Sequence, residues 1–490
     1  MSSLKNWVAV LILAGAFFAF LGSRGLNEPD EGRYAEIARE MLISGDWLTP
    51  HLNGFEHFQK PPLLYLVTAV SFSIFGLNEW AARIPSTLAA LGIVAMTAWM
   101  ASTLFGRKSA WPTALILSSS FLFFALARFL TPDMLMSFFI VAALACVVKN
   151  SFGKSPSAFW RWGFFLAMGL GFMTKGPMAF VVPISAAIFF RQGVRPTLPS
   201  PSLPWLRGMF LALAVGFFWF GVMAYIHPPL LRYFLDYELL QRFGSHTHGR
   251  SHPFWYFLPV IALGFLPWVI FVPRMAMRLL EKIRAKRSFT AAQWLLLGWI
   301  IPPFLILSCS GSKLLTYVLP LLPAFSLGMV HGWQQQKYSL VALNKIAVVS
   351  MLFLLLVFSQ ADRWNDLFSR QASIRSLAMS ILQRPDGRGI PVFSAGIRLH
   401  SLEFYLGRPV SVCQSDADLV CSVPPLEQGR LFQSLTAARD QMALKPNSLG
   451  VVRQVDFNSA FQSRGWEIMG RAGDFVLIHL KKSSSADQAL

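Results

Sequence analysis

The sequence predicts a mainly α-helical protein that crosses a membrane many times and ends in a small α/β domain. The 490 residues are 54% hydrophobic and 14% charged, with a mean hydropathy of +0.49, whereas soluble domains carry about 25% charged residues. Apolar runs long enough to cross a bilayer recur as far as residue 360. Beyond that point the chain turns polar and alternates between strand-like and helix-like segments.

About eleven apolar segments are expected to cross the bilayer. The first is predicted to be a retained span rather than a signal peptide, because Gly22-Ser23-Arg24 and an acidic helix follow it instead of a clean cleavage site. Pro62–Gly76 is short, begins with Pro-Pro and ends in Gly, which favours a juxtamembrane helix that does not cross. The predicted spans lie near 6–26, 84–105, 110–127, 134–149, 162–174, 177–190, 207–226, 254–273, 291–309, 314–331 and 340–360.

The positive charge follows the loops between these spans. Residues 1–360 hold 28 Lys and Arg against 12 Asp and Glu, and residues 361–490 hold 15 against 12. If Pro62–Gly76 does not cross, the basic loops share one side, predicted to be the cytoplasm. Of the acids in residues 1–360, only Glu281 then falls on that side. The net charge of +19 therefore reflects membrane topology, and no nucleic-acid partner is expected.

The outer face thus collects the unusual residues, beginning with a predicted amphipathic helix. Tyr34, Ile37, Ala38 and Met41 recur at helical spacing from Glu31 onward and form its apolar face. We expect its acids, Glu31, Glu36 and Glu40, to face water. Asp30 follows Pro29, where its carboxylate can cap the helix or can point inward and take part in the reaction.

Further candidates follow on the same face, each with a simpler alternative. Lys60 precedes Pro-Pro, where a lysine can bind a lipid phosphate or merely snorkel. Arg128 and Asp133 bracket two span ends and can form a local pair, and Lys175 lies in a break between two apolar runs. The loop 227–253 and the 311–317 turn add the remaining candidates: Glu238, Arg242, His252, Lys313 and Tyr317.

Metal binding is one alternative for the 227–253 loop. His246, His248 and His252 form an H-x-H-x-x-x-H pattern that could hold a divalent ion, although no carboxylate at fixed spacing completes it. No P-loop, GxGxxG, GxSxG or HExxH motif is present, so the sequence gives no support for nucleotide-driven or serine-hydrolase chemistry.

The tail is predicted to be a domain of its own. "IPVFSAG" and "DFVLIHL" are typical of strands, and "RLHSLEFYLG" and "FNSAFQSRG" of short helices that end at glycine. We expect a membrane domain over 1–360, with an outer first loop at 27–83, and an outer α/β domain over 361–490. Cys413 and Cys421 in the tail can pair in an oxidising compartment or stay reduced.

Five motifs occur in the order of a known family. The chain resembles the bacterial aminoarabinose transferases of lipid A and their relatives in the dolichyl-phosphate-mannose protein mannosyltransferase superfamily. The resemblance covers about residues 7–335. It is carried by "PDEGRYAEIAREMLISGDWLTPHLNGFEHFQKPPLLY", "ARFLTPDMLM", "GFMTKGPMAFVVP", "RSHPFWYFLPVIALGFLPW" and "GSKLLTYVLPLLPAFSLG".

The resemblance implies a GT-C glycosyltransferase that moves a sugar from a polyprenyl phosphate to an acceptor at the outer face of the bacterial inner membrane. It implies that Asp30 is catalytic and that Arg33 and Lys60 bind the carrier phosphate. One position departs from the aminoarabinose branch: Gln59 replaces the glutamate usual beside that lysine, so the resemblance does not carry over a metal site that uses this acid.

The predicted function is therefore an inverting transferase that uses undecaprenyl-phosphate sugar, with lipid A, another envelope glycolipid or a protein as acceptor. Asp133 is the second predicted catalytic acid, and Tyr34, Arg128, Lys175 and the loop candidates above join Arg33 and Lys60 as substrate-binding residues. The alternatives are a protein or polysaccharide glycosyltransferase of the same fold and a transporter of lipid-linked sugars. A transporter would place ionisable residues at mid-bilayer, whereas these residues gather at one face.

Overall fold

The computed structural model is mainly helical, as the sequence predicts. It describes residues 2–152, 157–194, 203–234, 252–336, 338–360, 363, 373–396, 398–413, 431–432, 434–445, 447–462 and 465–480. The chain divides into two compact units. We call Met1–Ala19, Gln59–Leu64 and Arg83–Phe358 the membrane unit, and Phe20–Phe58, Tyr65–Ala82 and Ser359–Leu490 the loop–tail unit.

Helices account for most of the membrane unit, and each predicted span coincides with one or more of them. Their bounds are α1 (Ser2–Phe18), α4 (Glu79–Phe105), η1 (Arg107–Ser109), α5 (Ala110–Ser118), α6 (Phe121–Leu126), α7 (Pro132–Phe152), α8 (Ala158–Phe172), α9 (Met178–Val194), α10 (Trp205–Ile226), α11 (Pro229–Tyr233), η3 (Phe254–Tyr256), α13 (Phe257–Gly264), η4 (Trp268–Phe271), α14 (Val272–Arg284), α15 (Ala291–Cys309), η5 (Leu315–Leu321), α16 (Leu322–Gln335) and α17 (Leu340–Ser359).

Six helical stretches among the described residues are long and apolar enough to cross a bilayer: α4, α7, α10, α15, η5 with α16, and α17. Shorter apolar helices lie at Trp7–Phe18, Leu63–Phe75 and Met178–Gly193. The predicted polytopic fold is confirmed, and the predicted number of about eleven spans depends on how many of the shorter helices also cross.

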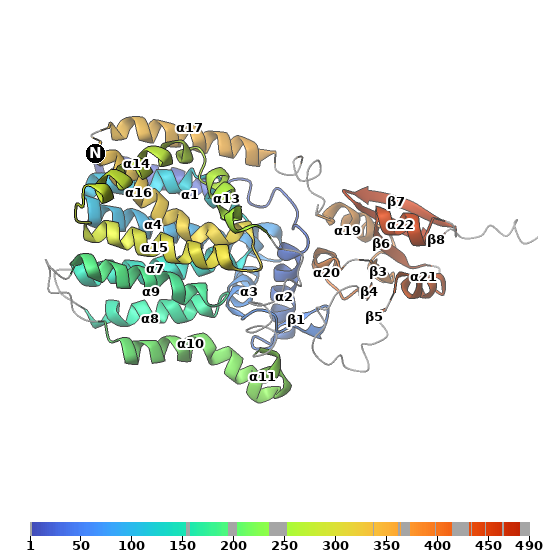
Figure 1. Ribbon diagram of the computed structural model, residues 1–490. Coiled ribbons are helices and arrows are strands. Elements are labelled where there is room, and N and C mark those ends of the chain that lie inside the picture. Colours follow the sequence, from blue (N-terminus) through green and yellow to red (C-terminus); the bar gives the residue numbers. More distant parts are fainter. Residues whose placement is uncertain are drawn as a thin grey trace, which may run out of the picture. The chain divides into compact units, whose positions relative to one another are not determined.

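Small residues bring neighbouring helices of the membrane unit close together. Helices α7, α8, α9 and α15 run alongside one another (Figure 1). A Cβ on Gly298 of α15 would lie 2.7 Å from the Ser185 carbonyl oxygen of α9, and the Ser185 hydroxyl donates to the Gly298 carbonyl oxygen at 2.8 Å. In lipid, where no hydrophobic effect drives helices together, such close approach and hydrogen bonding hold the bundle together.

The segment predicted as a single span over 254–273 is broken instead. Phe254–Gly264 and Trp268–Arg284 meet at an angle of 110°, and Pro267 stands in the break. Proline lacks the N–H that would continue the helix. The Trp268 indole donates to Ser119 at 3.1 Å and anchors the chain just past the bend. The predicted span is therefore present as a bent helix pair rather than as one continuous helix.

The loop–tail unit contains the predicted first-loop helix, a hairpin and the predicted α/β fold. The Asn53-Gly54 turn of the hairpin has positive φ at both residues, which suits a tight two-residue connection. The bounds are α2 (Asp30–Ser44), β1 (His51–Leu52), β2 (Phe55–Glu56), α3 (Leu63–Phe75, from Tyr65 onward in this unit), α19 (Arg375–Leu382), β3 (Val392–Ala395), α20 (His400–Leu406), β4 (Ser411–Cys413), β5 (Leu431–Phe432), α21 (Leu435–Ala443), β6 (Leu449–Arg453), α22 (Gln454–Ala460), β7 (Trp466–Ala472) and β8 (Phe475–Leu480).

The tail forms one mixed sheet in the order β5-β4-β3-β6-β8-β7. Strand β3 pairs in parallel with β4 and β6, and β8 pairs antiparallel with β6 and β7. One apolar cluster packs α19 and α20 on the sheet and a second packs α21 and α22. The predicted strands in "IPVFSAG" and "DFVLIHL" are confirmed, as is the helix that ends at Gly407. The Cys413–Cys421 question lies outside the described residues, because Cys421 is not among them.

The acids of α2 do not all face water, contrary to our expectation. Glu31 is 1% exposed and Glu36 is 0% exposed, whereas the apolar positions of the helix are buried as predicted. Glu31 pairs with Arg24 and Glu36 pairs with Arg39, and α20 also packs against α2. By contacts, the first loop groups with residues 359–490, and the division into a 1–360 and a 361–490 domain remains a prediction.

Candidate active site

Asp30 is the first residue of α2 rather than its cap. Pro29 occupies the cap position without a side-chain hydrogen bond, so of the two alternatives for Asp30 the structure does not support the helix cap. A proline at this position leaves Asp30 already helical. The Asp30 carboxylate is 48% exposed and accepts from the Arg33 guanidinium at 2.5 Å, and Arg33 lies 5.4 Å from the Tyr34 ring centre. Three predicted site residues therefore share the first turn of α2, with an accessible carboxylate among them.

The acids on either side of Asp30, Glu28 and Glu31, accept hydrogen bonds from other parts of the loop–tail unit. Arg24 donates to both oxygens of Glu31, at 2.6 and 3.2 Å, and the Asn27 amide donates to the same carboxylate at 3.2 Å. Glu28 accepts from the His400 amide at 3.1 Å and the Ser401 amide at 2.6 Å. Burial raises the pKa of Glu28 to about 7, since desolvation outweighs these hydrogen bonds.

A second group of predicted residues meets inside the membrane unit. Asp133, at the start of α7, is buried and pairs with Lys175 from the α8–α9 connection. The Lys175 ammonium lies 4.7 Å from the ring centre of Tyr317 in η5. Three elements thus converge on one ion pair, and buried charge at a helix end is typical of functional sites as well as of structural pairs.

Arg128 and Lys313 bind helix ends. The Arg128 guanidinium donates to the carbonyl oxygens of Ala16 and Ala19, at the end of α1, and lies 4.2 Å from the Phe124 ring centre. The Lys313 ammonium donates to the Ser310 carbonyl oxygen at 2.5 Å, just after α15. Both cations satisfy carbonyl groups that a helix end leaves without partners. The local-pair alternative required Asp133 to pair with Arg128, but Asp133 pairs with Lys175.

The remaining candidates are described in part. Lys60 is half-buried in the turn before α3, and His252 stacks on Tyr256 with ring centres 4.1 Å apart. Glu238 and Arg242 lie outside the described residues, as do His246 and His248, on which the metal alternative depends.

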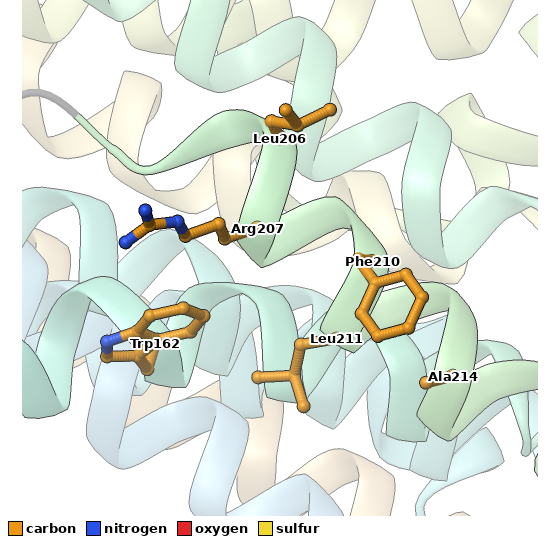
Figure 2. A pocket seen from close by; sticks show the side chains of 6 residues that line it. All are labelled: Trp162, Leu206, Arg207, Phe210, Leu211 and Ala214. Carbon is orange, nitrogen blue, oxygen red and sulfur yellow. The ribbon is translucent and has the colours of Figure 1, made fainter.

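An apolar cavity of about 510 Å³ lies away from these residues, between α8 and α10. Figure 2 shows Trp162 on α8 facing Leu206, Arg207, Phe210, Leu211 and Ala214 on α10. Its lining offers one guanidinium and no carboxylate, imidazole or hydroxyl. General acid–base catalysis needs such groups, so we assign no reaction to this cavity.

The sequence did not reveal the residues of the tail that touch the first loop. Glu28 accepts hydrogen bonds from His400 and Ser401 of α20. The Tyr405 hydroxyl of α20 contacts Leu26 and Glu79. Each of these contacts spans more than 300 positions of sequence. The one available signal was the density of acids around Asp30, which exceeds what one catalytic carboxylate requires.

Part of the chain matches a known family. The family model described as dolichyl-phosphate-mannose-protein mannosyltransferase matches residues 59–220. The resemblance that the motifs predicted is thereby confirmed over these residues.

Particular relatives refine the resemblance. An undecaprenyl phosphate-α-4-amino-4-deoxy-L-arabinose arabinosyl transferase from Edwardsiella ictaluri is 32% identical over 326 residues, 65% of this chain and 58% of that protein. The first such enzyme of Sodalis glossinidius is 36% identical over 315 residues, 63% of this chain and 55% of that protein. The chain therefore spans less than two thirds of the length of these relatives.

Solved structures show the same fold. ArnT from Cupriavidus metallidurans, crystallised with undecaprenyl phosphate, superposes with a TM-score of 0.81 at 23% identity and covers 97% of this chain and 98% of its own. An oligosaccharyltransferase of Archaeoglobus fulgidus, tethered to an acceptor peptide, gives a TM-score of 0.54 at 13% identity over 92% of this chain and 69% of its own.

Proposed function

We propose that this protein is an integral membrane glycosyltransferase that moves a sugar from undecaprenyl phosphate to lipid A or another envelope glycolipid. The observation that carries the proposal is the first turn of α2, where a half-exposed Asp30 carboxylate lies beside the Arg33 guanidinium. A carboxylate can deprotonate an acceptor and a guanidinium can hold a phosphate. The names of the curated relatives, which are aminoarabinose transferases using undecaprenyl phosphate, support the donor class.

The reaction is a single displacement at the anomeric carbon. Asp30 accepts the proton of the acceptor hydroxyl, and the acceptor oxygen forms a bond to the anomeric carbon from the face opposite the phosphate. The bond between that carbon and the phosphate oxygen breaks, and its electron pair leaves with the polyprenyl phosphate. Arg33 stabilises the charge on the departing phosphate. Lys60 keeps the role in binding the carrier phosphate that the resemblance implies. The configuration at the anomeric carbon is inverted, and Asp30 later returns its proton to water.

Asp133 and Lys175 have a supporting role in this proposal. Their ion pair under the Tyr317 ring fixes one lysine and one aromatic face near a helix end. Lysine at such a place can bind phosphate oxygens, and a tyrosine face can pack against a sugar or an isoprenoid chain. We assign the pair to substrate binding and orientation rather than to proton transfer.

The active site is proposed to face the periplasm, together with the C-terminal domain. The distribution of charges supports this orientation, because positive loops remain in the cytoplasm. A reporter enzyme fused after Arg107 should read cytoplasmic, and one fused after Asp362 should read periplasmic. The opposite result at either fusion would overturn the orientation and the proposed location of the site.

A protein acceptor is the second candidate. The matching family model is named for protein mannosyltransferases, so the fold alone does not decide between a lipid and a polypeptide. Mass spectrometry of envelope lipids and of glycosylated proteins, with and without this chain, separates the two. We expect a sugar-sized mass increment on lipid A or another glycolipid when the protein is present. An increment confined to proteins would replace the lipid acceptor with a protein.

A further inference from the structure

Helix α20 of the C-terminal domain lies along α2, and charged side chains of the first loop hold both of its ends. Glu28, two residues before Asp30, accepts from the amides of His400 and Ser401 at 3.1 and 2.6 Å and also from the Ser401 hydroxyl. At the other end, Arg39 donates to the Gly407 carbonyl oxygen at 3.4 Å. The chain therefore supplies an acid for the free amides of α20 and a cation for its last carbonyls.

The approach of the two helices near Glu28 depends on a glycine. A Cβ on Gly32 would lie 2.5 Å from the Ser401 amide nitrogen, a separation that a side chain does not tolerate. Glu28 is 3% exposed and Ser401 is 0% exposed. The contact between the two chain segments is thus tight, dry and hydrogen-bonded, which favours a single arrangement.

A second contact fixes the backbone just upstream. The Leu26 amide donates to the Tyr405 hydroxyl of α20 at 2.8 Å, and that hydroxyl donates to Glu79 at 3.0 Å. Leu26 and Glu28 are thereby both tied to α20, and only Pro29 separates Glu28 from Asp30. The backbone position of Asp30 is therefore set by a helix of the tail.

Other contacts keep the tail on the first loop without Glu28. Asn53 and Val410 exchange two hydrogen bonds, at 2.9 and 3.0 Å, and Arg398 donates to the Leu52 carbonyl oxygen at 3.1 Å. Both lie at the hairpin, away from Asp30. A substitution at Glu28 is therefore expected to shift the Asp30 loop while the tail stays attached.

We infer that Glu28 is a positioning residue, which uses α20 of the C-terminal domain to hold the Asp30 carboxylate where it meets the acceptor hydroxyl. The C-terminal domain is then part of the active site and does not act as a separate module. This inference rests on the proposed function, because it assigns Asp30 the role of base.

The test compares Glu28→Ala, Glu28→Gln and Ser401→Ala in the full-length protein with wild type and with Asp30→Asn. Asp456→Asn is the control, since it removes the charge of Asp456 from the partly buried Arg453–Asp456 pair inside the tail. Transfer from undecaprenyl-phosphate sugar to purified lipid A gives kcat and the donor KM. Hydrogen exchange of residues 400–407 reports the contact with α2 without reference to activity.

We expect Glu28→Ala to lower kcat by about 10- to 100-fold, because a displacement of about 1 Å can cost 100-fold, with the donor KM within about twofold. Exchange of the His400 and Ser401 amides should rise. Glu28→Gln keeps one acceptor oxygen and should recover part of kcat. Ser401→Ala should lower kcat less than Glu28→Ala, and Asp456→Asn should leave kcat near wild type.

The outcomes separate the inference from the proposed function. If wild type transfers no sugar, the proposed function fails. If wild type is active and Asp30→Asn is not, but Glu28→Ala keeps full kcat, the positioning role fails. A loss in Glu28→Ala that Asp456→Asn reproduces would also overturn it, because general weakening of the tail would then explain the effect.

Discussion

The two units bury their acids in different ways. In the membrane unit, Asp133 is paired with a single lysine from the next helix connection. In the loop–tail unit, Glu28 is held by backbone amides, Glu31 by Arg24, and Glu36 by Arg39 at 2.6 Å from both of its oxygens. Compared with Glu28, Glu31 and Glu36, Asp30 keeps a half-exposed carboxylate. The difference teaches that a high density of acids at a membrane edge reflects contacts that hold the chain in place as much as chemistry.

The largest effect is expected at the accessible acid. Asp30→Asn keeps the shape of the side chain and can still accept from Arg33, but it cannot take a proton. Transfer should fall by about 10²–10⁴-fold, with binding of the lipid donor retained. Initial rates with purified protein and a donor-binding assay measure both quantities. Asp46→Asn, on the same loop, is the matched control and should stay near wild-type activity. Near-normal transfer by Asp30→Asn would remove Asp30 from catalysis.

The sequence predicted what depends on short-range patterns. Apolar runs located the helices, and Tyr34, Ile37 and Met41 gave the buried face of α2, since side-chain periodicity is a local property. The motifs around Asp133, Lys175 and Tyr317 named three residues that do meet. In contrast, α20 packs against α2 although it lies more than 350 residues away, and no local pattern encodes that partner. The sequence shows the proline at position 267, but it does not show the angle at which the two helices meet there.

The next effect concerns the ion pair of the membrane unit. Asp133→Asn leaves the Lys175 ammonium without its carboxylate, and such a change typically costs about 3–5 kcal/mol. The detergent-solubilised variant should unfold at a clearly lower temperature than wild type. Asp133→Asn combined with Lys175→Met should regain stability, because no unpaired charge remains. If the double variant also regains transfer, the pair is structural and does not belong to the site.

A smaller effect is expected at Lys60. Lys60→Ala removes one cation from the proposed phosphate site and should raise the donor KM at least about tenfold, equivalent to about 1.4 kcal/mol. The effect on kcat should be slight. Steady-state kinetics at varied donor concentration measure the two separately. Lys149→Ala, at the last turn of α7 where the lysine lies 5.7 Å from the Trp99 ring centre, is the control. An unchanged donor KM would mean that Lys60 only snorkels.

The last effect is on stability rather than on transfer, and it concerns a carboxyl group that the proposed reaction does not use. Glu403 of α20 is 0% exposed, and neither of its oxygens has a hydrogen-bond partner among the described residues. Burial raises its pKa well above 4.5; Arg398 opposes this shift, and Glu36, Glu40 and Glu28 reinforce it. The neighbouring His400 is buried with its pKa lowered, so it adds no positive charge near neutral pH.

The sign of the pH dependence follows from these shifts. Unfolding frees Glu403 and Glu28 to titrate near 4.5, whereas the folded protein keeps their protons to higher pH. The free energy of unfolding should therefore fall as pH rises above 4.5, by about 1.4 kcal/mol per pH unit for each retained proton. Glu403→Gln removes one such proton, so its stability should decline less steeply than wild type between pH 5 and pH 8. Thermal unfolding across this range measures both slopes, with Glu467→Gln, on the exposed side of β7, as the control. Equal slopes for Glu403→Gln and wild type would show that Glu403 is ionised in the folded protein.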